Sequence, residues 1–173
     1  MTQVLRTERL ILRPHELADF EAMSAMWADP AVVEHVFDQP QTGEETWSRL
    51  LRYRGHWALL GFGYWAVIDA ETEAFLGEVG SANFHRGIEP SIDGIPEAGW
   101  VLSRAAHGRG IAREAMTAAL DWMRESGRAT QSVAIILPGN AKSITLAERL
   151  GYRWSHNAPY KGKDRLIYAW TAE

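Results

Sequence analysis

The stretch AHGRGIAREA, residues 106–115, places Gly108, Arg109 and Gly110 directly before a segment with helical spacing. The first N–H groups of a helix have no partner within the helix, and together with the helix dipole they attract anions. The two glycines would let a bulky anion approach the backbone closely. The stretch therefore predicts a phosphate-binding turn between a strand and a helix, and the alternative is a structural turn without a ligand.

Two common phosphate-binding motifs do not fit this turn. A Walker P-loop requires Gly-Lys-Ser/Thr, whereas this chain has Gly110-Ile111-Ala112. A dinucleotide fingerprint requires a third glycine, and its position is held by Arg113. The identity of the phosphate must therefore come from the surrounding sequence.

The composition is that of one globular domain spanning residues 1–173, with 46% apolar and 23% charged residues. A net charge of -4 argues against a general nucleic-acid partner, because such proteins are usually basic. The longest uncharged run, residues 57–68, is too short to span a bilayer, so we expect a cytoplasmic protein without membrane contact. The absence of cysteine excludes an acyl-cysteine intermediate and thiolate metal sites, and the six histidines lack ligand spacing, so no metal is predicted.

The apolar pattern predicts a single mixed α/β sheet flanked by helices, in the order β-α-α-β-β-β-α-β-α-β-β. The strand, helix and strand from Glu97 to Leu137 imply a parallel pair, and the other connections imply antiparallel pairing. Strands are predicted at 4–12, 62–69, 74–84, 97–103, 132–137, 152–156 and 166–171, and helices at 19–27, 42–53, 111–126 and 141–150.

Three separated motifs resemble the GNAT N-acetyltransferase superfamily and, within it, the ribosomal-protein (RimJ/RimL-like) branch. The superfamily pattern Gln/Arg-x-x-Gly-x-Gly/Ala is matched by Gly110 and Ala112, while His107 departs from it at the first position. Three segments resemble the branch: TERLILRP at 7–14, EAGWVL at 97–102, and NAKS at 140–143 followed by ERLGY at 148–152.

This resemblance implies that acetyl-coenzyme A binds as co-substrate between two splayed parallel strands at the centre of the sheet. Its pyrophosphate would lie on the glycine turn, its pantetheine arm would pair with the fourth strand, and Asn140 would hydrogen-bond the arm. The predicted coenzyme contacts are Trp100, Val101, Leu102, His107, Gly108, Arg109, Gly110, Ile111, Ala112, Arg113, Asn140, Lys142 and Ser143.

Acetyl transfer to an amine needs a base, and the leaving thiolate benefits from a hydrogen-bond donor. Glu97 is the predicted base, through a water molecule, with Glu78 in reserve. Many superfamily members have a tyrosine acid seven residues after the asparagine, but that position is Ala147 here, so Ser143 is the predicted donor. Because no cysteine is present, direct attack on the thioester is expected. The acceptor pocket is predicted to involve His35, Tyr64, Glu78 and His85, and the loop at 86–96 could shape it.

The predicted function is therefore acetyl transfer from acetyl-coenzyme A to a primary amine, either a protein N-terminus or a small molecule. Two alternatives stay open at this point: a non-catalytic sensor of coenzyme A and a partner-binding module. The oligomeric state is also open.

Overall fold

The computed structural model describes residues 3–37 and 39–171, and within them eight strands form one sheet. The strands lie in the order β1-β2-β3-β4-β5-β6-β8-β7, and only β5 and β6 pair in parallel. Their bounds are β1 Leu5–Arg6, β2 Leu10–Arg13, β3 Tyr64–Asp69, β4 Phe75–Ala82, β5 Glu97–Leu102, β6 Gln131–Ile136, β7 Arg153–Tyr160 and β8 Lys163–Thr171. The predicted fold class, a mostly antiparallel mixed sheet with one parallel pair, is confirmed.

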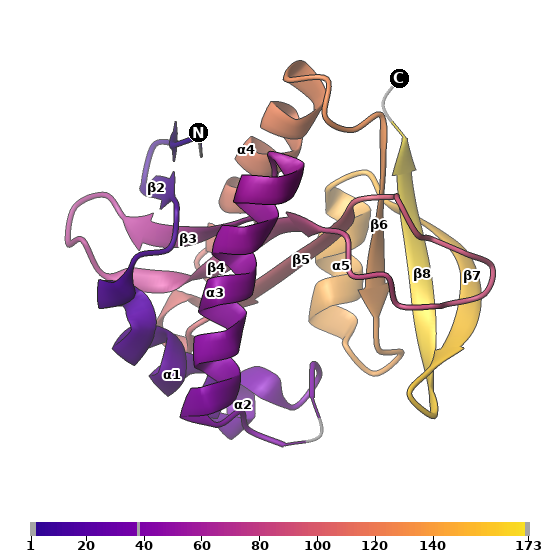
Figure 1. Ribbon diagram of the computed structural model, residues 1–173, viewed down its shortest axis with the longest axis horizontal. Coiled ribbons are helices and arrows are strands. Elements are labelled where there is room, and N and C mark those ends of the chain that lie inside the picture. Colours follow the sequence, from indigo (N-terminus) through magenta and orange to yellow (C-terminus); the bar gives the residue numbers. More distant parts are fainter. Residues whose placement is uncertain (1–2, 38, 172–173) are drawn as a thin grey trace.

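Helices flank this sheet, and α3 crosses over strands β3 to β5 in Figure 1. Their bounds are α1 Phe20–Ala28, α2 Pro30–Val33, α3 Gly43–Leu60, α4 Ile111–Glu125 and α5 Ala141–Arg149, with short 3-10 turns at Leu17–Asp19 and Arg104–Ala106. The capping box at Thr42 and Glu45 begins α3, and Gly61 at φ +71° ends it.

Alternating residues of the strands face different helices, as the pleat requires. On β3, Tyr64 packs with α1 and α3, whereas Trp65 packs in the main core with α4. Trp57, Trp65 and Trp122 form a ring cluster there, with centroids 4.8 to 5.5 Å apart. Trp57 and Trp65 are buried, and Trp122 is partly buried against them.

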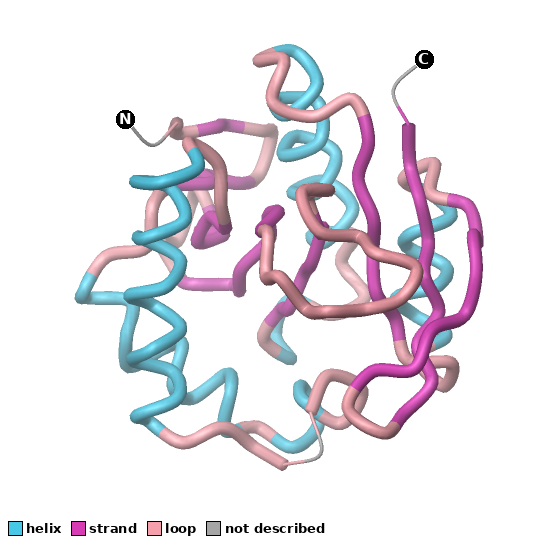
Figure 2. The backbone as a smooth tube through the Cα atoms, turned by 45° about the vertical axis from the view of Figure 1, so that its right-hand side comes forward, coloured by secondary structure: helices cyan, strands magenta, loops and turns pink. Residues whose placement is uncertain are grey.

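The sheet divides between β5 and β6. These strands pair only at Glu97 with Val133 and at Ala98 with Ala134, whereas β4 and β5 pair along six residues each. Figure 2 shows β6, β7 and β8 as a group set apart from the other strands. The edge of β5 from Gly99 to Leu102 is therefore not covered by β6, as the splayed pair of the resemblance implied.

The loop after β4 crosses in front of β6 and β8 in Figure 1. Ile88 and Ile92 are buried there against Val133, Ala158 and Ile167. This segment, predicted as a loop, is thus anchored to the second half of the sheet by apolar packing.

Several predicted boundaries were wrong. The strand expected at 4–12 is two strands, β1 and β2, because the chain turns at Thr7, whose N–H donates to the Leu10 carbonyl. The helix expected to end at 53 continues through Gly55 to Leu60, and the short helix α2 was not predicted. Both strands of the closing hairpin are longer than expected, since β7 extends to Tyr160 and β8 begins at Lys163.

Candidate active site

A cavity of about 760 Å³ opens where β5 and β6 part. One wall comes from α1, α3 and β3, and the opposite wall comes from β6, α5 and the β7–β8 hairpin. Residues 97–101 of β5 lie between the two walls. The divided sheet therefore produces both the open strand edge and the cavity beside it.

The turn before α4 has the backbone of an anion site. Gly108 and Gly110 have φ of +71° and +76°, a region that favours glycine. No N–H group from Gly108 to Arg113 donates to another group of the described residues. A Cβ at Gly108 would meet nothing within 4 Å, so the approach to these amides is open.

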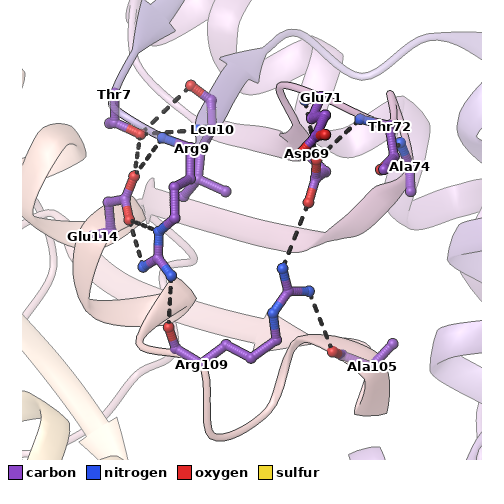
Figure 3. Close-up of polar contacts among 10 residues, drawn as sticks. All are labelled: Thr7, Arg9, Leu10, Asp69, Glu71, Thr72, Ala74, Ala105, Arg109 and Glu114. Carbon is purple, nitrogen blue, oxygen red and sulfur yellow. Dashed lines mark hydrogen bonds and ion pairs between the residues drawn. The ribbon is translucent and has the colours of Figure 1, made fainter.

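A polar clamp holds this turn against the N-terminal strands (Figure 3). Glu114, in the first turn of α4, accepts hydrogen bonds from the Thr7 hydroxyl and from the backbone and side chain of Arg9. Arg9 also donates to the carbonyl of Arg109 at 3.0 Å. Burial alone would raise the pKa of Glu114, but these hydrogen bonds lower it.

The arginines predicted to contact phosphate have different surroundings. The Arg109 guanidinium lies 3.7 Å from Asp69 and points toward the carbonyl of Ala105 (Figure 3). Arg113 and Lys142 are exposed. His107 turns its Nε2 to the Leu102 carbonyl at 2.9 Å, so the ring lies at the end of β5.

A hydrogen bond bridges the cleft between β5 and α5. Trp100 Nε1 donates to Ser143 Oγ at 3.2 Å, and the backbone N–H of Ser143 donates to Asn140 Oδ1 at 3.1 Å. Asn140 thus caps α5 from the floor of the cavity. The structure brings these three predicted residues together.

Glu97 lines the cavity in a bidentate ion pair. Arg86 Nε and Nη2 donate to its two carboxylate oxygens at 2.6 and 2.7 Å, and Arg86 Nη1 donates to the Tyr160 hydroxyl. Burial alone would lower the pKa of Arg86, but hydrogen bonds to Glu97 and Tyr160 raise it. Arg86 was not predicted from the sequence, because an arginine in a loop rich in glycine and proline is usually exposed to solvent.

Glu78 is completely buried behind the cavity wall. Its Oε1 accepts from the Tyr53 hydroxyl at 2.5 Å and from Trp27 Nε1 at 3.1 Å, and its Oε2 lies 3.6 Å from His15 Nε2. Glu78 itself does not line the cavity, whereas Tyr53 and Trp27 do. Burial raises the pKa of Tyr53 well above its usual value, so its hydroxyl remains protonated.

The other predicted acceptor residues divide between the cavity and the surface. Tyr64 lines the cavity, stacks on Tyr53 with ring centroids 4.6 Å apart, and places its hydroxyl against Gly99, where a Cβ would be 2.0 Å away. His35 lies at the rim beside Glu34. His85 is exposed, faces Asp93 and does not line the cavity.

Among the described residues, no three His, Asp, Glu or Cys side chains converge as metal ligands. In the same part of the chain, no helix combines the length and apolarity needed to cross a membrane.

Comparison with known proteins agrees with this geometry. The family model described as an acetyltransferase (GNAT) domain matches residues 9–153. A GnaT-family acetyltransferase from Bordetella pertussis is 33% identical, with 96% of this chain and 98% of that chain covered and a TM-score of 0.84. An acetyltransferase from Agrobacterium tumefaciens is 32% identical, with 98% and 95% covered and a TM-score of 0.85.

A ribosomal-protein α-N-acetyltransferase in complex with coenzyme A shares the fold, with a TM-score of 0.80 at 16% identity over 98% of each chain. Because the family model spans most of the sequence and two solved relatives exceed 30% identity, this chain belongs to the GNAT family of acetyltransferases.

Proposed function

We propose that the protein, as a single domain of residues 1–173, transfers the acetyl group of acetyl-coenzyme A to a primary amine by direct attack. The observation on which this rests most is the parting of β5 and β6 after two residue pairs. It leaves a strand edge at Gly99–Leu102 available to an extended amide-bearing arm, beside a cavity large enough for an acceptor.

The described residues fit coenzyme A both at the turn before α4 and at the edge of β5. The N–H groups from Gly108 to Arg113 have no partner in the described part of the chain and would hold the pyrophosphate, with Arg113 and Lys142 supplying exposed positive charge nearby. Arg109 would contribute its backbone, since its guanidinium lies at Asp69. When bound, the co-substrate supplies an activated thioester.

Within the site, the protein has to accept a proton from the amine and to stabilise the thiolate. Glu97 is the proposed base, because of the two carboxylates considered it is the one that lines the cavity. Ser143 is the proposed hydrogen-bond donor to sulfur, since its hydroxyl lies in the cleft beside Trp100. The backbone of β5 would supply N–H groups to the developing oxyanion.

The resemblance to the ribosomal-protein branch supports a protein N-terminus as one acceptor, and the size of the cavity beside β5 supports a small amine as another. Release of free thiol from acetyl-coenzyme A, measured with a panel of N-terminal peptides and small amines, tests the proposal. Amine-dependent release supports an enzyme. Thermal stabilisation by coenzyme A without release would indicate a sensor, and no stabilisation would indicate a partner-binding module.

A further inference from the structure

Arg49, on the cavity side of α3, is a buried cation that forms no ion pair with the residues the structure describes. Its residue is only 8% exposed, and its guanidinium stacks on the Trp27 ring at 3.8 Å. No carboxylate oxygen of the described residues lies within 4.0 Å of its guanidinium nitrogens, the distance that defines an ion pair. Among the described residues, the Arg49 side chain hydrogen-bonds Tyr53 and, at a long 3.4 Å, the side-chain oxygen of Gln41.

The nearest buried carboxylate does not neutralise Arg49 directly. The oxygens of Glu78 are directed to Tyr53, Trp27 and His15. Burial alone would lower the pKa of Arg49, but Tyr53 and Glu78 raise it, so the guanidinium keeps its charge. Removing a charge from water is costly unless it is paired, and Arg49 Nε is buried with no hydrogen-bond partner in the described ranges 3–37 and 39–171.

A second arginine lies one turn further along the same helix. Arg52, an exposed residue, also lines the cavity at its rim, and its guanidinium lies 5.4 Å from the Phe84 ring. It forms no ion pair with any residue that the structure describes. Burial and then repulsion by Arg49 lower the pKa of Arg52. Two like charges therefore share one wall, and an anion placed beside them would relieve the repulsion between them.

The cavity as a whole is rich in positive charge, although the chain has a net charge of -4. Six arginine and lysine side chains line it, against three glutamates. Glu97 is already paired with Arg86, and Glu45 is held by hydrogen bonds from Thr42 and acts on Arg49 only through longer-range charge. Within the described residues, Arg49 and Arg52 are the cations of the α3 wall that form no ion pair, and this wall stands across the cavity from the hairpin and next to β5.

We propose that Arg49 and Arg52 bind a carboxylate of the acceptor, so that the substrate class is a primary amine that also carries a carboxylate. The inference rests on the proposed function, because it assumes that the amine enters this cavity. A planar guanidinium fixed on an aromatic ring matches a planar carboxylate in two hydrogen bonds. Holding the carboxylate of the acceptor at α3 would direct its amine toward Glu97 and β5.

Binding to the coenzyme A-saturated protein tests this proposal without depending on turnover. Titration calorimetry compares matched pairs: free amino acids with their carboxamides, and amidated peptides beginning Ser-Glu-Glu with those beginning Ser-Gln-Gln. We expect at least one set of pairs to favour the carboxylate by roughly tenfold to a hundredfold, as for a hydrogen bond to a charged group. The set that shows the preference identifies an amino acid or an acidic peptide as the source of the carboxylate.

Three variants assign the preference to residues. R52Q lies at the rim and R49K keeps the buried charge, so both should fold, and each should reduce the preference about tenfold. R54Q, an exposed arginine of the same helix outside the cavity, should keep it. Equal binding of carboxylate and amide, binding of neither, or a preference unchanged in R52Q and R49K would overturn the inference. If the preference is present but no pair releases thiol from acetyl-coenzyme A, the proposed function fails while the carboxylate site stands.

Discussion

At Glu97 the carboxylate is held by Arg86 on one side and faces the cavity on the other. A carboxylate in this position is fixed in orientation, which a base acting through a water molecule requires. The same ion pair means that a change at Glu97 also leaves Arg86 with Tyr160 as its remaining partner. Rate and stability must therefore be measured separately.

For Glu97→Gln, which keeps size but removes basicity, we expect a fall in kcat of roughly 10²-fold. Affinity for acetyl-coenzyme A should be nearly unchanged, because the side chain does not touch the phosphate turn. Steady-state kinetics across neutral pH, with thermal shift for binding, would check both. The matched variant Glu78→Gln should lose stability rather than rate. The opposite pattern would identify Glu78, acting through Tyr53, as the base.

Ser143→Ala tests the donor to sulfur. The gain from such a donor is small for a thiol of pKa about 8.5, so we expect kcat and kcat/KM to fall together by about tenfold. Binding of acetyl-coenzyme A should change little, and Ser126→Ala, on the exposed end of α4, should change nothing. A loss confined to coenzyme affinity would instead make Ser143 a contact to the pantetheine arm.

Single residues were the least predictable level of this molecule. Arg49 and Tyr53 are buried residues of α3, and the sequence predicted a helix there without showing which of its polar residues face the core. Arg86 and Glu97 are eleven positions apart across a loop, and their pairing depends on how that loop packs on β6 and β8. Asn140 and Ser143 were predictable because cap and helix are contiguous.

At the scale of elements, the turn before α4 depends on backbone conformation and on its clamp. Gly110→Asp places a side chain and a negative charge at a φ of +76°. Coenzyme A at about 100 times its Kd should stabilise the parent by about 2.7 kcal/mol and should fail to stabilise the variant. Gly127→Asp is the control, since Gly127 has a similar φ of +67° at the other end of the helix. Equal thermal shifts for parent and Gly110→Asp would contradict the phosphate turn.

The Glu114 clamp predicts a dependence of stability on pH. Its pKa in the folded chain lies below its ordinary value of 4.5, so the unfolded chain takes up the proton first as the pH falls. The clamp therefore stabilises fully at neutral pH, and its contribution is lost as the pH falls below that ordinary value and through the lowered pKa of the folded chain. Urea unfolding should show a flatter acid limb for Glu114→Gln than for the parent. Glu125→Gln, exposed at the end of the same helix, should follow the parent. An identical acid limb in both glutamine variants would argue against the clamp.

At the scale of the whole molecule, coenzyme A would connect the two parts of the divided sheet. β5 and β6 share only two residue pairs, so the bound arm would add contacts where the strands part. Hydrogen exchange followed by mass spectrometry should show slower exchange at 99–102 and 108–113 when coenzyme A is bound. The β7–β8 turn at 161–162 should be unaffected. Protection limited to the β7–β8 hairpin would place the ligand elsewhere.

The order of elements and the parallel pair could be predicted, because periodicity and crossover length are local or nearly local properties. The point at which β5 leaves β6 could not be read from periodicity, since both strands continue as apolar runs beyond it. It came from resemblance alone. The two-strand N-terminus was missed although Arg6, Thr7, Glu8 and Arg9 are four polar residues in succession, which interrupts the alternation. The structure places the turn there, and the Thr7 side chain contacts both Leu10 and Glu114.

The cluster of Trp57, Trp65 and Trp122 has an optical consequence. Three indoles with centroids 4.8 to 5.5 Å apart and steep relative tilts couple their electronic transitions. Such coupling produces a paired band in the far-ultraviolet circular dichroism that vanishes when the rings separate. Trp100 belongs to the cleft, where its Nε1 donates to Ser143, and its emission would respond to what fills the cleft. Of the eight tryptophans in the chain, the coupled three would report on the packing of the core and Trp100 on the occupancy of the site.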